Sequence, residues 1–388
     1  MSRAGAEASA QLALAAREAA LCGVTRLADV TGLDNIGVAV FQAVRPWGRT
    51  LSVHQGKGLK AHAAKIGALM EAVETDHAET FPRTFDGERL ARPFSALPKM
   101  ERAASVGDFA ASRARAPTGE ETLGWVAARR LSDEGRLWTP LDCVRLDFTR
   151  PGEARLDQTS NGLGARFDRE GAVMKALLEV VERDAEQAWF AAPIQRRTRD
   201  LIEARSIPFR WFGDLRASLD RAGLMLSLYR LPAVIAAPVF LAEIHEAGAG
   251  ACLRRRAMGV GCAASPEAAL IAGVVEAAQS RLTAISGVRD DILYPREARS
   301  ERGGFGVALP VPAHIAPIAW DEIQEMFEAR GAGSSTALAE QLARAGYPDA
   351  AIVDLSRPGR GAVVVKAVVP GLGAFQRRRR PVSGPGRP

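Results

Sequence analysis

The stretch SNGLGARFDREGAVMKALLEVVERDA, residues 160–185, decides the fold, because a Gly-x-Gly run stands directly before a long helix with apolar periodicity. Gly162 and Gly164 form the run, and Glu179 and Glu182 follow on the helix. Side chains three residues apart share one face of a helix, so the two carboxylates point in one direction.

The same arrangement of a Gly-x-Gly run and helical acids occurs twice more. The other copies are Gly56–Lys57–Gly58 with Glu71 and Glu74, and Gly259–Val260–Gly261 with Glu276 and Gln279. In chain order, 13, 15 and 15 residues lead from the second glycine to the first carboxylate. This recurrence predicts three related strand–helix units in an α/β (α+β) fold.

The oxygen ligands on the three helices indicate a site for a hard cation and the phosphates that it carries. Five carboxylates and one amide are ligand types that suit Mg²⁺ together with bound phosphate. Apolar neighbours place these acids at or near buried positions, where an unpaired carboxylate is costly unless a cation or an arginine compensates it. Arg183, beside Glu182, adds a fork-shaped donor for phosphate.

Each motif taken alone has a simpler interpretation. One E-x-x-E pair is typical of a solvated helix face, and one Gly-x-Gly run can simply mark a turn. Three correlated copies favour the metal–phosphate interpretation over both.

Length and composition indicate a globular protein that does not span a membrane. The chain has 388 residues, 47% of them hydrophobic, which is enough for a large core in one or two domains. No uninterrupted apolar run approaches the length needed to cross a bilayer. The first 23 residues mix Arg and Glu among Ala and Leu, which predicts an amphipathic helix and no secretory signal. We therefore expect a cytoplasmic protein without a membrane partner.

The formal net charge of +6 is concentrated at the C-terminus. Five arginines, Arg377–Arg380 and Arg387, lie in the last twelve residues. Without them the formal charge of the body falls to about +1, so nucleic acid is not an expected partner. The four cysteines and five histidines show no spacing typical of a disulfide framework or a zinc site.

The pattern predicts an N-terminal helix over residues 1–23, one catalytic domain over 24–376 and a disordered basic Pro/Gly-rich tail over 377–388. Helices are expected over 61–80, from Asp168 to about Phe190, from Ser265 onward, over 214–222 and over about 321–345. Strands are expected as two stretches over 24–54 and one over 123–131, one over 138–148, a pair over 224–231 and 233–245, and late strands over 350–356 and 361–372.

Three pieces of the sequence resemble the YcaO superfamily, ATP-dependent enzymes that modify backbone amides of peptides or proteins. They are GKGLKAHAAKIGALMEAVETDHAE (56–79), residues 160–185, and AASPEAALIAGVVEAAQSRLTAISGVRDDI (263–292). The likeness runs from Val24–Thr25–Arg26 to Val369–Pro370–Gly371–Leu372, nearly the whole chain. The segments EAVETDHAE, QSRLTAISGVRDD and VVPGL are most similar to the branch of the family that is encoded beside TfuA proteins. That branch is associated with thioamide formation in ribosomally made peptides.

This resemblance implies that ATP and Mg²⁺ bind among the three helices of a YcaO-type fold. The implied metal and ATP carboxylates are Glu71, Glu74, Glu179, Glu182 and Glu276, with Gln279 and Arg183 as further ATP contacts. The implied partners are a peptide or protein substrate and a TfuA-like protein, and a homodimer stays open. The implied nucleophile is sulfide or a Cys, Ser or Thr of the substrate. It adds to a peptide carbonyl, and ATP phosphorylates the resulting oxyanion. No side chain of this chain is assigned as the catalytic residue.

Several positions depart from the family pattern. Gly67 stands where the family usually has Ser, and Ala263 follows Cys262 where the related branch commonly has His. Lys175 takes a place often held by His, and the segment ahead of Thr25–Arg26 looks shortened or altered. Two alternatives therefore stand beside thioamidation: an azoline-forming cyclodehydratase, and a non-catalytic peptide-binding scaffold of the same family.

Overall fold

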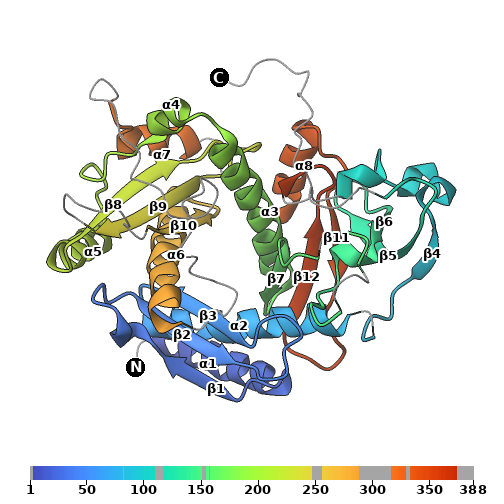
Figure 1. The fold of residues 1–388 in the computed structure, drawn as a ribbon, viewed down its shortest axis with the longest axis horizontal. Coiled ribbons are helices and arrows are strands. Elements are labelled where there is room, and N and C mark those ends of the chain that lie inside the picture. Colours follow the sequence, from blue (N-terminus) through green and yellow to red (C-terminus); the bar gives the residue numbers. More distant parts are fainter. Residues whose placement is uncertain are drawn as a thin grey trace, which may run out of the picture. The chain divides into compact units, whose positions relative to one another are not determined.

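The computed structural model describes residues 3–81, 83–109, 117–150, 154–156, 158–246, 256–287, 316–328 and 333–373. The chain forms two compact units, each built from two segments (Figure 1). Unit 1 comprises residues 1–74 and 185–333, and unit 2 comprises residues 75–184 and 334–388. The boundaries fall inside helix α2 (Ala61–Thr80) and helix α3 (Arg169–Ala191). The mixture of helices and sheets confirms the predicted fold class.

Unit 1 contains two three-stranded antiparallel sheets. The first has β1 (Arg26–Asp29), β2 (Ala39–Val44) and β3 (Val53–Gly58) in that order. The second has the order β10 (Ala257–Cys262), β9 (Val239–Glu246), β8 (Leu224–Arg230). The predicted pair over 224–245 is thus confirmed. The region before residue 58 has three strands instead of the expected two, because a short 3-10 turn at Thr31–Leu33 separates β1 from β2.

Helix α6 (Pro266–Ser286) packs against β9 and β10 and also against β3 (Figure 1, orange). It begins as predicted: the Ser265 hydroxyl accepts a hydrogen bond from the Ala268 amide at 3.3 Å, and Pro266 occupies the first turn. The core of unit 1 joins Leu270 and Val274 of α6 to Phe240 of β9. Among the described helices only α6 is long and apolar enough to cross a membrane, and these contacts are typical of a core helix.

Unit 2 is built on a six-stranded antiparallel sheet. Its order is β4 (Arg89–Pro93), β5 (Thr122–Arg130), β11 (Ala351–Asp354), β12 (Val363–Val368), β7 (Leu163–Arg166), and β6 (Arg136–Pro140) also pairs with β5. Phe109, Trp125 and Trp138 fill the core of one part of this unit. The strand expected over 138–148 ends at Pro140, where a 3-10 turn begins, because proline has no amide hydrogen for the ladder.

The remaining helices are α1 (Arg3–Leu21), α4 (Ile194–Arg197), α5 (Arg210–Arg221), α7 (Trp320–Glu328) and α8 (Ser335–Arg344). The single helix expected over about 321–345 is wrong, since α7 and α8 are separate. Ser334 caps α8 by accepting a hydrogen bond from the Ala337 amide at 3.1 Å, which starts a new helix after Gly333. The predicted tail, 377–388, lies outside the described residues.

The Gly-x-Gly runs allow a strand and the next helix to touch backbone to backbone. At least one glycine of each run lies within a strand: Gly56 in β3, Gly164 in β7 and Gly261 in β10. Gly162 precedes β7 in a turn, with a φ of 83°. A Cβ atom added to Gly56 would lie 1.9 Å from the Ala64 carbonyl oxygen. At Gly164 and Gly261 the corresponding distances, to the carbonyl oxygens of Ala172 and Ala269, are both 2.3 Å. The repeated motif is therefore a repeated packing contact, which fixes where each acid-bearing helix begins.

His77 gives unit 2 a pH-dependent stability. Its side chain is fully buried, and its Nδ1 lies 2.8 Å from the Leu355 carbonyl oxygen. Burial, and then the Arg357 cation, lower the pKa of His77 from 6.5 to about 4. The unfolded chain takes up a proton below pH 6.5 while the folded chain does not, so stability falls as the pH drops from 6.5 to 4.

We expect wild-type protein to lose about 3 kcal/mol of unfolding free energy over this pH range in excess of what His77→Gln loses. Urea denaturation of both proteins across the range measures the difference. Equal losses in the two proteins would show that His77 is not held neutral in the folded state.

Candidate functional site

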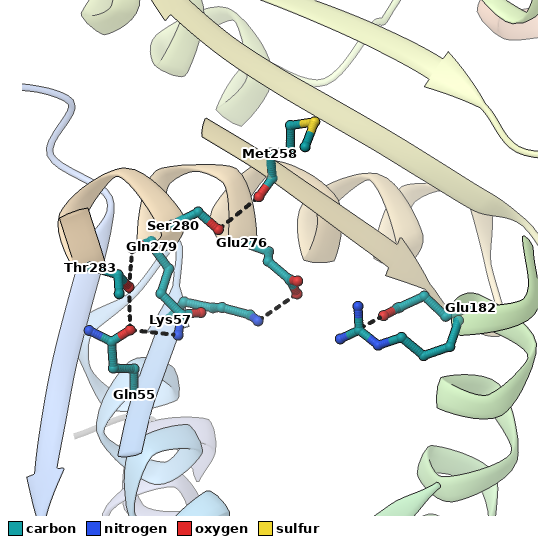
Figure 2. Close-up of polar contacts among 9 residues, drawn as sticks. Gln55, Lys57, Glu182, Met258, Glu276, Gln279, Ser280 and Thr283 are labelled. Carbon is teal, nitrogen blue, oxygen red and sulfur yellow. Dashed lines mark hydrogen bonds and ion pairs between the residues drawn. The ribbon is translucent and has the colours of Figure 1, made fainter. Parts of the chain in front are cut away.

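A polar stripe on α6 faces strand β3 within unit 1 (Figure 2). The Lys57 ammonium donates to Glu276 Oε2 at 2.7 Å. One turn further along, Gln279 Nε2 donates to Gln55 Oε1 at 3.2 Å, and the Thr283 hydroxyl donates to the same oxygen. Two predicted ATP-site residues, Glu276 and Gln279, are thus brought together on one face, and each contacts a side chain of β3.

The alternation of β3 explains why Lys57 and Gln55 point toward α6. Successive side chains of a strand point to opposite faces. Gly56 is pressed against Ala64 and Ala68 of α2, so its two neighbours face the other way. Lys57 and Gln55 were not among the residues predicted to bind ATP. The period of two around the tightly packed glycine was the signal that could have found them.

Helix α2 carries the predicted pair Glu71 and Glu74 in unit 1. Glu71 is partly buried, and Glu74 is buried with 6% of its surface exposed. Gly67 lies one turn earlier, against β3. A Cβ atom there would be 3.4 Å from Gly56 Cα, an ordinary contact. The packing therefore leaves room for the Ser that the family resemblance leads us to expect at this position.

Helix α3 carries Glu179, Glu182 and Arg183 in unit 2. Its first turn is capped by Asp168, which accepts a hydrogen bond from the Gly171 amide at 2.6 Å, as the sequence predicts. Glu179 and Glu182 are partly buried. Arg183 Nη2 lies 3.7 Å from Glu182 Oε1, so the predicted phosphate donor also compensates a predicted metal carboxylate.

The donor set fits a magnesium ion that arrives with phosphate. In the described part of the chain, no three His, Cys, Asp or Glu side chains are close enough together to hold a metal by themselves. Mg²⁺ usually binds proteins through one or two carboxylates and completes its shell with phosphate oxygens and water. The Lys57 ammonium, 2.7 Å from Glu276, already acts as a stand-in cation on one of the predicted ligands.

Comparison with known proteins places these features in a family. A family model described as YcaO cyclodehydratase, ATP- and Mg²⁺-binding, matches residues 55–373. A protein encoded in the tfuA 3' region of Rhizobium leguminosarum bv. trifolii is 32% identical over 369 residues. That alignment covers 90% of this chain and 84% of the relative.

Two solved structures share the fold. YcaO from Methanopyrus kandleri, bound with AMPPCP and Mg²⁺, has a TM-score of 0.65 at 21% identity and covers 96% of both chains. A heterocyclase in complex with substrate and cofactor has a TM-score of 0.71 at 20% identity. The match covers 90% of this chain and spans half the length of the heterocyclase. Because the family model matches most of the sequence, this chain belongs to the YcaO family, ATP-dependent peptide-modifying enzymes that bind ATP and Mg²⁺.

Proposed function

We propose that this protein uses ATP to convert a peptide backbone amide into a thioamide, together with a TfuA-like partner. The observation that carries the choice of product is the relative encoded in a tfuA 3' region, which aligns with 90% of this chain at 32% identity. We further propose that the protein works in the cytoplasm, where ATP is available and thiols stay reduced. Its described cysteines, Cys22, Cys143 and Cys262, form no disulfide with one another, in keeping with such a compartment.

The proposed reaction balances with sulfide as the sulfur source. Sulfide adds to the amide carbonyl carbon, and the oxygen becomes an oxyanion. The oxyanion attacks the terminal phosphorus of ATP and releases ADP. The carbon–oxygen bond then breaks, and phosphate departs with the former amide oxygen. The proton that the sulfur carried as hydrosulfide ends on the phosphate, and a carbon–sulfur double bond remains. Phosphorylation turns a poor leaving group into a good one, which is the reason for coupling the reaction to ATP.

We assign binding of Mg–ATP to the acids predicted on the three helices. They are Glu71 and Glu74 of α2, Glu179 and Glu182 of α3 and Glu276 of α6, with Gln279 and Arg183 as further contacts. When bound, Mg²⁺ would neutralise charge on the phosphates. The chain's own part is to orient the nucleotide and to present a guanidinium for charge that develops on the transferring group, the role given to Arg183.

A second product class, an azoline ring, is favoured by one observation: the structural likeness to a heterocyclase. The two reactions share the phosphorylation step and differ in the nucleophile, which in azoline formation is a Cys, Ser or Thr of the substrate. Mass spectrometry separates them. A thioamide exchanges one oxygen for sulfur, whereas an azoline loses one water.

Nucleotide binding tests whether the chain is an enzyme or a scaffold. We expect wild-type protein to bind Mg–ATP, and Glu71→Ala to weaken the affinity by about tenfold or more, because a carboxylate assigned to the cation is lost. Isothermal titration calorimetry measures both. Glu325→Ala removes an exposed acid of α7 in the same unit and should bind like wild type.

Absence of Mg–ATP binding by the wild type would favour the non-catalytic scaffold. If binding occurs, the peptide encoded by a neighbouring gene, sulfide and the TfuA-like protein are added. Release of ADP and phosphate is then followed together with the mass of the peptide. Turnover that yields only an azoline would overturn thioamide formation.

A further inference from the structure

We infer that Lys57 is a tethered cation that occupies the Glu276 carboxylate until Mg–ATP binds and then pairs with a phosphate oxygen. This inference rests on the proposed function and adds a residue to it. The starting observation is the 2.7 Å ion pair between Lys57 Nζ and Glu276 Oε2, which joins the middle of a Gly-x-Gly run to a predicted metal ligand 219 residues away.

The backbone of Lys57 is fixed, whereas its side chain is long enough to change partner. Gly56 next to it is held against Ala64 and Ala68 of α2, and β3 is paired with β2, in which Val40 lies opposite Lys57. A lysine ammonium on a four-carbon stem can change partner without moving the strand. The strand thus holds Lys57 at a set distance from α6 in both arrangements.

Breaking the ion pair between Lys57 and Glu276 costs little free energy. The Lys57 and Glu276 side chains are 30% and 23% exposed, so water reaches both. Partly exposed ion pairs contribute little net stability. A divalent cation attracts the carboxylate more strongly than an ammonium does, because its charge is higher. It also arrives with phosphate oxygens, which the released ammonium can bind. One lysine would therefore neutralise the acid before nucleotide binding and the phosphates afterwards.

Other hydrogen bonds hold α6 in place when Lys57 changes partner. Gln55, on the same face of β3, holds Gln279 and Thr283 of α6 through its Oε1. Ser280 of α6 donates to the Met258 carbonyl oxygen of β10 at 2.7 Å (Figure 2). These bonds are independent of Lys57, so α6 stays in place when the ammonium leaves Glu276.

Lys57→Met tests the inference because it keeps the length of the side chain and removes its charge. Two titrations are needed: Mg²⁺ alone, and the non-hydrolysable analogue AMPPCP at saturating Mg²⁺, both by calorimetry. We expect the variant to bind Mg²⁺ alone more tightly, by about threefold to tenfold, because the competing ammonium is gone. We expect it to bind Mg–AMPPCP about tenfold more weakly, because a charge-assisted contact to phosphate is lost.

Lys60→Met, an exposed lysine three residues on, should leave both affinities unchanged. Changes of opposite sign in Lys57→Met are the signature of a cation that changes partner. Unchanged affinities, or a loss in both titrations, would overturn the inference, since a merely structural ion pair gives one of those results. If wild-type protein binds no Mg–AMPPCP, the proposed function fails first. If it binds and the variant behaves like wild type, only the role of Lys57 fails.

Discussion

Glu179→Gln is expected to lower ATP-dependent phosphate release by about 100-fold or more while leaving the fold intact. The substitution keeps the shape of the side chain and removes one negative charge from helix α3. A neutral amide is a poor ligand for Mg²⁺, so a nucleotide that needs the cation to hold its phosphates is no longer oriented for transfer. The measurement is phosphate release with the peptide substrate, sulfide and partner protein present.

Two controls separate loss of chemistry from loss of structure. Glu340→Gln removes the charge of an exposed carboxylate on α8, in the same unit, where it pairs with Arg344 one turn away. That variant should match wild type in phosphate release. Thermal unfolding should give similar midpoints for all three proteins. Normal phosphate release by Glu179→Gln would remove this residue from the set of metal ligands.

The sequence predicted best where local chemistry alone decides the structure. Helix α2 spans Ala61–Thr80, the predicted range, and α6 begins at the Ser265–Pro266 signal because a capping hydroxyl and a proline act within one turn. Prediction failed where one helix was expected over 321–345. Ser334 caps a new helix there, a break that the prediction did not include.

At the candidate site, too, local features were predicted from the sequence and long-range contacts were not. The spacing of the acids was readable because it depends on helix geometry over three residues. The side chains that contact those acids could not be predicted from the sequence. Lys57 meets Glu276, and Gln55 meets Gln279, across 219 and 224 residues of chain, and such pairs depend on how β3 and α6 pack. What the sequence did contain was the alternation around Gly56, which determines the face on which Lys57 and Gln55 lie.

The Gly-x-Gly runs also change meaning between sequence and structure. As a motif they suggest a turn or a loop that approaches a ligand. In the structure Gly56 of β3 and Gly261 of β10 lie inside strands and meet helix backbone, at Ala64 and Ala68 for β3 and at Ala269 and Gly273 for β10. The motif and the acids therefore recur together because the glycines set the distance of the helix that carries the acids. The proposed binding site and the packing would therefore both depend on one repeated contact.

Gly56→Ala is expected to destabilise the protein by about 3 kcal/mol or more. The added methyl group would lie 1.9 Å from the Ala64 carbonyl oxygen and 2.1 Å from the Ala68 amide nitrogen, both backbone atoms of α2 that have no other rotamer to adopt. The helix must move away from the strand, and its apolar contacts loosen along several turns. Urea unfolding measures the loss, and a fall in soluble yield would have the same cause.

Gly67→Ala is the matched control, because it adds the same methyl group to the opposite side of the same contact. There the new carbon would lie 3.4 Å from Gly56 Cα, and alanine is a better helix former than glycine, so we expect a gain of up to about 1 kcal/mol. The two substitutions therefore have opposite signs although they add identical atoms to facing residues. Equal destabilisation by both would mean that the strand and helix pack less closely than described, and the explanation of the repeated glycines would fail with it.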